Sequence, residues 1–263
     1  MQYNLNNDVH KQDLSLTNDD IGLTRRDLKN IAGKTLKWAG SDSHALFEQN
    51  IKNPETYEKL KLYGWLDPDC ISYKYNKYGF RCDEFDDRAA GIALGCSHTE
   101  GTGLPEQSSW PSVLSKLLGI HVWNLGVGAV SLDTVFRLLD YWLPKLSPKF
   151  VTICIPSTSR VEVFQNKTPI NLGPWPIDSQ THEYYYKVWN DSDINRILLR
   201  KKNLLAIQQL CNTANTKLIM LDSYLIANNG SGMTARDLKH FGVQNHEYFA
   251  QQIYKNLPTE LKQ

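Results

Sequence analysis

The stretch GIALGCSHTEG (91–101) joins a short apolar run to a turn that carries a serine. Residues 91–95 are apolar or small and end in glycine, which is typical of a buried strand. Ser97 follows at the strand-to-loop turn, where a nucleophile would be accessible at the carboxyl edge of a sheet. A serine in such a turn also serves as an ordinary turn or cap residue. The rest of the chain decides between these two interpretations.

The segments that follow repeat the order strand, turn, helix. A helix capped by Ser109 and stopped by Gly119 precedes a strand candidate, HVWNLG (121–126). Ser131 caps a further helix, which is expected to end before Pro144. The remaining elements are the buried-strand candidates FVTICI (150–155) and KLIML (217–221) and helices over about 191–212 and 245–257. This alternation predicts an α/β fold with a parallel sheet covered on both faces and ligands at the carboxyl ends of its strands.

Residues 1–85 differ in character from residues 86–263, which predicts an N-terminal extension followed by the catalytic domain. The extension is polar and irregular, with short helices expected over 24–31 and 54–62, and it ends in the aromatic segment YKYNKYGFRCDEF (73–85). Covering the sheet edge and forming an oligomer contact are the alternatives for its role. A second aromatic segment, 163–190, predicts an excursion from the sheet.

The overall charge excludes one class of partner. The 263 residues contain 29 Lys+Arg and 28 Asp+Glu, so no basic excess supports binding to nucleic acid or to an anionic membrane. No apolar run approaches the roughly 20 residues that span a bilayer, and the N-terminus lacks the apolar core of a secretory signal. Five cysteines without metal-ligand spacing predict free thiols, a cytoplasmic location and no metal or organic cofactor.

The segment DLKH (237–240) lies between the last predicted strand and the last helix. Its spacing on a turn lets the Asp237 carboxylate reach one imidazole nitrogen of His240, which leaves the other free to act as a base. By itself such a pair is more often a helix-end aspartate and a surface histidine. With Ser97 upstream, the order Ser…Asp-x-x-His predicts a catalytic triad. His98 is expected to contact substrate or pack beside the loop, and Cys96 is the less favoured nucleophile.

The segment NLGVGAVS (124–131) runs from the second strand into a helix. Its backbone N–H groups face the same sheet edge as Ser97, as an oxyanion hole requires. An ordinary glycine-rich strand-to-helix turn is the alternative interpretation.

In this order GCSHTEG, NLGVGAVS and DLKH resemble the sequence blocks of the SGNH (GDSL-type) hydrolase family over about residues 88–257. The upstream YKYNKYGFR (73–81) resembles a lead-in of bacterial and bacteriophage members that have an N-terminal extension. The resemblance implies a flavodoxin-like three-layer α/β/α fold and ester hydrolysis. It also implies that Ser97 is the nucleophile, His240 the general base and then acid, and Asp237 the group that orients His240.

The oxyanion hole implied by the resemblance has three donors: the N–H of Ser97, the N–H of Ala129 where the family has glycine, and Thr158 in place of an asparagine. Thr158 has a shorter side chain, and losing one such donor costs about 2.7–4 kcal/mol of transition-state stabilisation. Thr158, Ser157 or Arg160 must therefore compensate, or the enzyme is slow.

The predicted function is a serine esterase that hydrolyses a small acyl ester, O-acetyl in the first instance, through an acyl-enzyme. A carbohydrate is the leading substrate class because flat aromatic faces suit sugar rings, although these aromatics could be core residues instead. They are Trp110, Trp175, Trp189 and Tyr184 to Tyr186. Two alternatives remain open: a binding or virion-associated protein that keeps the fold without turnover, and an acyltransferase that uses the same triad. The oligomeric state cannot be read from the sequence.

Overall fold

The computed structural model describes residues 28–165, 168–177, 179–229 and 232–262. Its central sheet has four parallel strands in the order β4-β3-β5-β8: β4 (His121–Asn124), β3 (Ala90–Gly95), β5 (Phe150–Ile155) and β8 (Lys217–Asp222). β3, the first of the four strands along the chain, lies inside the sheet, with β4 on one side and β5 on the other. This is a doubly wound, flavodoxin-like order, and it confirms the predicted fold class. Ligands are expected outside the carboxyl ends of β3 and β5, where the winding reverses.

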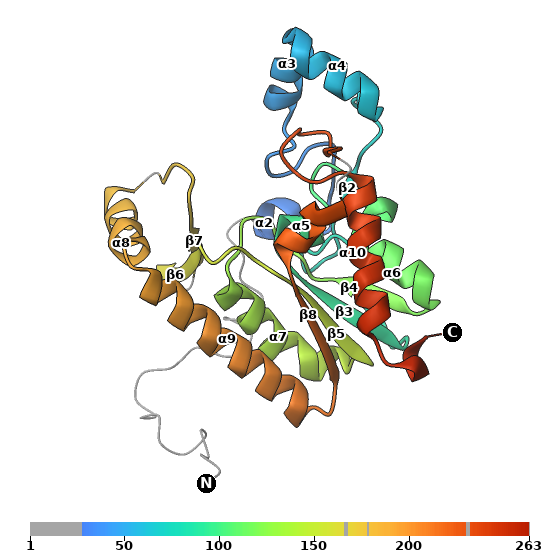
Figure 1. Ribbon diagram of the computed structural model, residues 1–263, viewed down its shortest axis with the longest axis vertical. Helices are drawn as coiled ribbons and strands as arrows, with labels where there is room; N and C mark the ends of the chain where they lie inside the picture. Colours follow the sequence, from blue (N-terminus) through green and yellow to red (C-terminus); the bar gives the residue numbers. More distant parts are fainter. Residues whose placement is uncertain (1–27, 166–167, 178, 230–231, 263) are drawn as a thin grey trace.

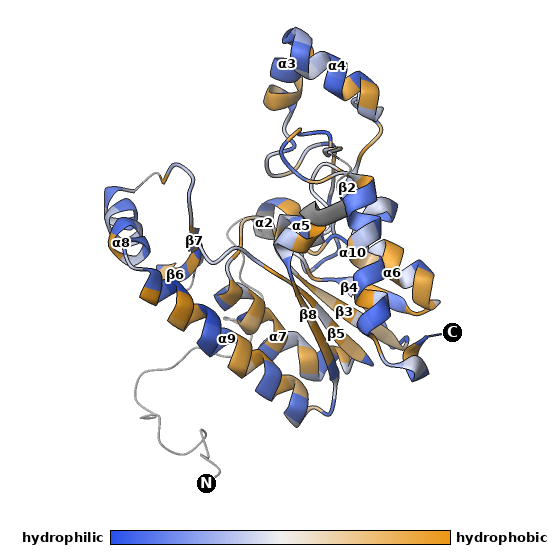
Figure 2. Cartoon of the chain, viewed as in Figure 1, coloured by the Kyte–Doolittle hydropathy of each residue, from blue (hydrophilic) through white to orange (hydrophobic). Residues whose placement is uncertain are grey.

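Two pairs of helices cover the sheet (Figure 1). One face packs against α7 (Leu132–Leu146) and α9 (Asp193–Thr213), and the other against α6 (Trp110–Leu118) and α10 (Val243–Asn256). Along β5 the side chains alternate between the two cores, with Val151 and Ile153 on the α7 side and Cys154 on the α10 side. Figure 2 shows the resulting apolar strands between helices of mixed hydropathy.

The predicted end of the helix after Ser131 is wrong by one short segment. The helix does not end before Pro144, because α7 continues through Pro144 to Leu146. The proline lies in the last turn, where its missing N–H removes a single backbone bond. The Ser147 N–H then closes the helix on the Leu143 carbonyl at 3.0 Å.

The described part of the N-terminal extension packs onto the loops that follow β3 and β8. It contains α2 (Leu28–Ile31), β1 (Thr35–Leu36), α3 (His44–Lys52), α4 (Pro54–Tyr63) and β2 (Tyr73–Lys74). The helix expected over 24–31 lies partly outside the described residues. Aromatic and aliphatic side chains of the extension share one core with Leu104 and Ala235 of the remaining chain. The extension therefore covers the carboxyl edge of the sheet, one of the two roles considered for it.

Arg81 fastens the end of this extension. Its side chain is 1% exposed and donates to the carbonyls of Gly101 at 2.6 Å and Leu104 at 2.8 Å, in the loop after the short helix α5 (Ser97–Glu100). Residues on both sides of the predicted 85/86 division are thus joined by buried contacts.

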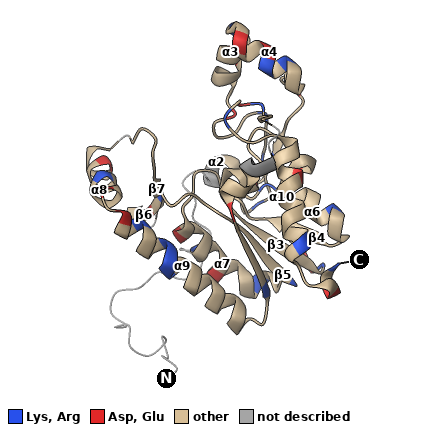
Figure 3. Cartoon of the chain, viewed as in Figure 1, with Lys and Arg blue, Asp and Glu red and all other residues tan. Residues whose placement is uncertain are grey.

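The predicted excursion begins at Val161 and is a hairpin followed by a helix. β6 (Val161–Gln165) pairs with β7 (Thr168–Leu172), and α8 (Gln180–Asn190) lies beyond them, away from the sheet (Figure 1). A buried ion pair between Arg137 of α7 and Glu162 of β6, at 2.8 Å, ties the hairpin to the body of the molecule. Charged residues of both signs are spread over the outer helices (Figure 3). Three short 3₁₀ helices complete the described part of the chain: η1 (Glu106–Ser108), η2 (Ser223–Asn229) and η3 (Thr259–Leu261).

Candidate active site

Ser97 is the first residue of α5 and stands directly after β3. The turn that places it depends on Gly95, whose φ is +149°. A Cβ at Gly95 would lie 2.3 Å from Thr99 Oγ1 and 2.6 Å from the Cys154 carbonyl oxygen, so no other residue fits. Ser97 itself is 8% exposed. Its N–H belongs to the first turn of a helix, where backbone donors have no partner within the helix.

A loop 140 residues further along the chain brings Asp237 and His240 to Ser97. The Ala235 N–H bonds the His240 carbonyl at 2.9 Å, and the Arg236 N–H bonds the Gly103 carbonyl at 2.9 Å, which fastens this loop beside α5. The Asp237 Oδ1 atom accepts the backbone N–H groups of Lys239 and His240, each at 3.0 Å.

The three side chains form a continuous hydrogen-bonded chain. His240 Nε2 lies 2.8 Å from Ser97 Oγ, and His240 Nδ1 lies 2.6 Å from Asp237 Oδ2. With Nδ1 protonated toward the carboxylate, Nε2 accepts the serine proton. This is the arrangement that activates a serine for nucleophilic attack.

Asp237 is held in its ionised form. Burial by itself would raise the pKa of its carboxyl group, but hydrogen bonds and charge from His240, with a further hydrogen bond from Ser41, outweigh it and lower the pKa. The negative charge therefore persists across the neutral range and can stabilise an imidazolium at His240.

The two neighbours of Ser97 do not compete for its role. Cys96 is buried and serves as the N-cap position of α5, while Ser97 bonds His240. The His98 ring stacks on Phe241 at a centroid distance of 5.0 Å and meets the His240 ring edge-on at 5.1 Å. Burial, and then the nearby charge of His240, lower the pKa of His98 well below its usual value. A neutral His98 packed beside the catalytic loop matches the second of its two expected roles.

A cavity of about 530 Å³ opens over Ser97 and His240. Gly128 and Ala129 of the second sequence block line it. Ala129 has a φ of +62°, the left-handed conformation that the family's glycine would adopt freely. Behind this block Gly126 meets α5 so closely that a Cβ there would lie 2.4 Å from the Glu100 nitrogen. The predicted oxyanion-hole segment therefore lies against the nucleophile turn.

The structure does not bring Thr158 to this cavity. Thr158 is exposed and lines a separate hollow with Ser157 and Arg200. In the turn that carries it, the Tyr186 hydroxyl of α8 donates to the Ser159 carbonyl at 2.9 Å. Arg160, the third residue considered, lines both this hollow and the Ser97 cavity.

Arg160 is oriented by Val130 of the second sequence block and by Trp175. Its Nη1 donates to the Val130 carbonyl at 3.2 Å, and its guanidinium carbon lies 5.6 Å from the ring centroid of Trp175. Within the described part of the chain, its buried Nε has no hydrogen-bond partner. A donor and a fixed positive charge are thus available beside Ser97.

The N-terminal extension forms one wall of the cavity, which reasoning from the sequence missed. Trp38, Ser41 and Tyr75 line it together with Leu36. Ser41 donates a hydrogen bond to Asp237 Oδ2 at 2.7 Å. The aromatic segment around Tyr75 signalled that the extension has a function, but nothing in GSDS (40–43) connects Ser41 with a residue 196 positions away.

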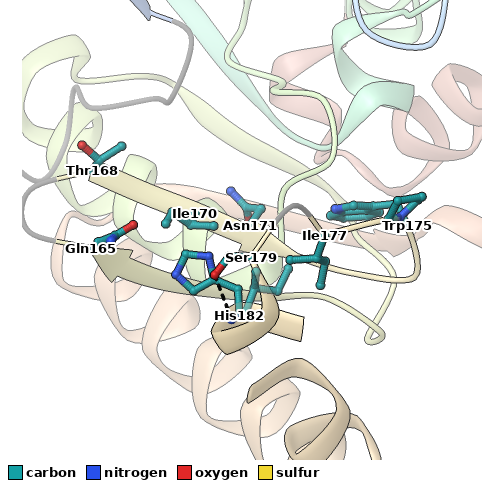
Figure 4. A pocket seen from close by; sticks show the side chains of 10 residues that line it. Gln165, Thr168, Ile170, Asn171, Trp175, Ile177, Ser179 and His182 are labelled. Atoms are coloured by element: carbon teal, nitrogen blue, oxygen red, sulfur yellow. Dashed lines mark hydrogen bonds between the residues drawn. The ribbon is translucent and has the colours of Figure 1, made fainter. Parts of the chain in front are cut away.

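A second cavity, of about 460 Å³, lies between the hairpin and α8 (Figure 4). Trp175 lines both cavities, so the two are neighbours on either side of this residue. Asn171, Ser179 and His182 contribute polar atoms to the second cavity, and Ile170 and Ile177 contribute apolar surface.

Within the described ranges no group of three or more His, Cys, Asp or Glu side chains could hold a metal ion. Nor does any helix in these ranges have the length and apolar character needed to cross a membrane. All five cysteines are free thiols.

Comparison with known proteins yields matches to solved structures only. No family model matches the chain, and no curated protein matches it. The chain is similar to a putative lipolytic protein of the G-D-S-L family from Desulfitobacterium hafniense, with 14% identity over 64% of this chain and 99% of that chain and a TM-score of 0.37.

Two carbohydrate-directed enzymes are also among the similar structures. A Clostridium thermocellum family 3 carbohydrate esterase shares 15% identity over 64% of this chain and 94% of that chain, with a TM-score of 0.35. An acetyl xylan esterase shares 13% identity over 64% of this chain and 100% of that chain, with a TM-score of 0.32. The function of the present chain is therefore inferred from the geometry of its own site.

Proposed function

We propose that the protein is a serine ester hydrolase of the SGNH type, in which Ser97, His240 and Asp237 form the catalytic triad. The observation that carries this proposal is the hydrogen-bonded chain from Ser97 Oγ through both imidazole nitrogens to a buried, ionised carboxylate. The order of these residues along the chain and the cavity above them support the same conclusion.

In the first half-reaction Ser97 Oγ attacks the ester carbonyl carbon while His240 Nε2 accepts the hydroxyl proton. The resulting imidazolium is stabilised by Asp237. Collapse of the tetrahedral intermediate breaks the bond to the alcohol oxygen, which takes the proton from His240 as it leaves. An acyl group then remains on Ser97 Oγ.

In the second half-reaction His240 removes a proton from water, which attacks the acyl-enzyme. The second tetrahedral intermediate collapses to a carboxylic acid and free Ser97. The oxyanion of both intermediates needs donors, and the N–H groups of Ser97 and Ala129 are two of them in this proposal. Arg160, which lines the cavity, replaces Thr158 as the third donor.

We propose an O-acylated carbohydrate as the substrate class. Trp38, Tyr75 and Trp175 present aromatic surface to the Ser97 cavity, which suits the faces of sugar rings. The second cavity beyond Trp175 offers a mixed polar and apolar lining in which a neighbouring sugar unit could bind. By contrast Trp110, also singled out in the sequence, is 0% exposed and packs on Phe249 as a core residue.

The test is hydrolysis of p-nitrophenyl acetate and of acetylated xylo-oligosaccharides by the wild type, Ser97→Ala and His240→Ala. Loss of the nucleophile or the base is expected to lower kcat by about 10⁴-fold or more. His44→Ala, on the exposed start of α3, is the matched control and is expected to keep wild-type rates.

Equal background rates in the wild type and both triad variants would contradict ester hydrolysis and favour the binding protein. Transfer of acetyl to an added sugar that exceeds release of acetate would favour the acyltransferase. No release of acetate from any acetylated sugar, by an enzyme that hydrolyses p-nitrophenyl acetate, would contradict the carbohydrate substrate.

A further inference from the structure

The Asp237 carboxylate accepts hydrogen bonds from four directions, and one of them comes from the N-terminal extension. Ser41 Oγ donates to Oδ2 at 2.7 Å, and the same oxygen accepts His240 Nδ1 at 2.6 Å. Ser41 Oγ also lies 3.4 Å from His240 Nδ1. The other oxygen, Oδ1, is held by the two backbone N–H groups of the 237–240 turn. Ser41 therefore touches the one carboxylate oxygen that orients the catalytic imidazole.

The position of Ser41 is set by a buried ion pair between its neighbour and the neighbour of Asp237. Asp42 and Arg236 are 1% and 0% exposed, and their side chains meet at 2.7 and 2.9 Å. A tight turn closes the segment, with Ala39 and Asp42 exchanging backbone bonds at 3.0 and 3.1 Å. The contacts of the neighbouring residues Ala39 and Asp42 thus hold the Ser41 hydroxyl against Asp237.

We propose that Ser41 is a positioning residue of the triad, whose hydroxyl fixes the Asp237 oxygen that orients His240. This inference rests on the proposed ester hydrolysis. Because Ser41 holds Oδ2 independently of the imidazole, it limits rotation of the carboxylate, and the imidazole keeps Nδ1 protonated and Nε2 free toward Ser97. The N-terminal extension then contributes to the chemistry as well as to the wall of the cavity.

Removal of the hydroxyl has two expected effects. The carboxylate gains rotational freedom, so kcat falls by about tenfold, the effect of losing a hydrogen bond of roughly 1.4 kcal/mol to a charged group. The Oδ2 atom also loses a donor that shares its negative charge, so it attracts a protonated imidazole more strongly. The acidic limb of the pH–rate profile therefore moves to higher pH.

Other charged and titratable groups surround His240, and the substitution leaves all of them in place. They are His98 and Glu100 of α5, Arg160 at the far side of the cavity, His246 of α10, and the Asp42–Arg236 pair. A shift of the acidic limb in a Ser41 variant is therefore assigned to the bond that was removed.

The experiment compares kcat, KM and the pH–rate profile of the wild type with Ser41→Ala, Ser41→Thr and Ser43→Ala. Ser43 lies in the same loop and caps α3 by accepting the Leu46 N–H at 3.2 Å, so its variant reports a structural loss in this segment. Ser41→Ala is expected to lose kcat about tenfold with KM within about twofold and to shift the acidic limb upward. Ser41→Thr restores both values, and Ser43→Ala changes neither. Wild-type kinetics in Ser41→Ala, or an unmoved acidic limb, would overturn the proposal.

A second measurement is independent of turnover. The proton on His240 Nδ1, bonded to a carboxylate at 2.6 Å, is expected as a far-downfield resonance in the ¹H NMR spectrum. Ser41→Ala is expected to shift this resonance and speed its exchange with water, and Ser41→Thr to restore it. An identical resonance in wild type and Ser41→Ala overturns the role of Ser41, even if the wild type hydrolyses no ester and the proposed function fails separately.

Discussion

Ala129 is a residue of the site with a strained backbone. Its φ of +62° puts an L-residue in the left-handed region, at the position where its N–H is proposed to face the oxyanion. A methyl side chain in that conformation costs about 1–2 kcal/mol, which glycine avoids. The chain thus retains the loop geometry with a residue that does not favour it.

Ala129→Gly is expected to raise the free energy of unfolding by about 0.5–1 kcal/mol. Relief of the left-handed strain outweighs the greater freedom that glycine has in the unfolded chain. Esterase activity is expected to stay within a few-fold of the wild type, because the backbone donor is kept. Urea denaturation measures the effect, and Ala129→Val serves as the opposite control, with a loss of stability. A less stable glycine variant would show that Ala129 is not strained.

At the scale of elements, the loop before α3 and the loop before α10 are joined by the Asp42–Arg236 pair. Arg236 adds bonds to the Pro68 carbonyl at 2.8 Å and the Lys37 carbonyl at 3.1 Å, and stacks 4.0 Å from the centroid of Trp38. One buried guanidinium therefore holds several turns of the extension against the segment that carries the triad.

Asp42→Asn is expected to lower the free energy of unfolding by about 3–5 kcal/mol, because it leaves the Arg236 charge buried without a counter-charge. Urea denaturation of this variant is compared with Asp69→Asn. Asp69 pairs with Lys37 at 2.6 Å on the surface, with side chains 74% and 44% exposed, so its loss is expected to cost less than about 1 kcal/mol. Similar costs for the two variants would contradict a structural role for the buried pair.

For the molecule as a whole, buried histidines make the free energy of unfolding depend on pH. Burial, and then the charges of His240 and Arg81, lower the pKa of His246 to about 3, and its Nδ1 accepts the Trp110 N–H at 3.1 Å. His246 stays neutral in the folded protein, while in the unfolded chain it takes up a proton below about pH 6.5. Stability therefore falls as the pH drops from about 6.5 toward 3. The lowered pKa of Asp237 acts in the same direction below about pH 4.

The free energy of unfolding is expected to decrease by up to about 1.4 kcal/mol per pH unit for His246 between pH 6 and pH 4. His246→Asn keeps an acceptor for the Trp110 N–H and removes this part of the slope. Urea denaturation at pH 7, 6, 5 and 4 measures it, with His44→Asn on the exposed face of α3 as the control. A slope that His246→Asn leaves unchanged would refute the assignment.

The local sequence pattern determined the strands, the helices and the parallel sheet of this protein. The β-branched run 150–155 and the alternation of apolar strands with capped helices each depend on neighbours a few residues apart, and the order of Ser97, Asp237 and His240 added the resemblance to a known family. Such short-range preferences are readable because the strand and helix periods repeat within one element. They were enough to predict the parallel sheet and the edge at which the three residues meet.

Tertiary structure alone decided which further groups face the reaction. Ser41 reaches Asp237 across 196 positions of sequence, and Arg160, rather than Thr158, lines the Ser97 cavity. Loop conformations of this kind are set by contacts between distant segments, each of which is unremarkable in its own sequence. The strands and helices follow from local periodicity, whereas the finished site depends on packing that no local pattern encodes.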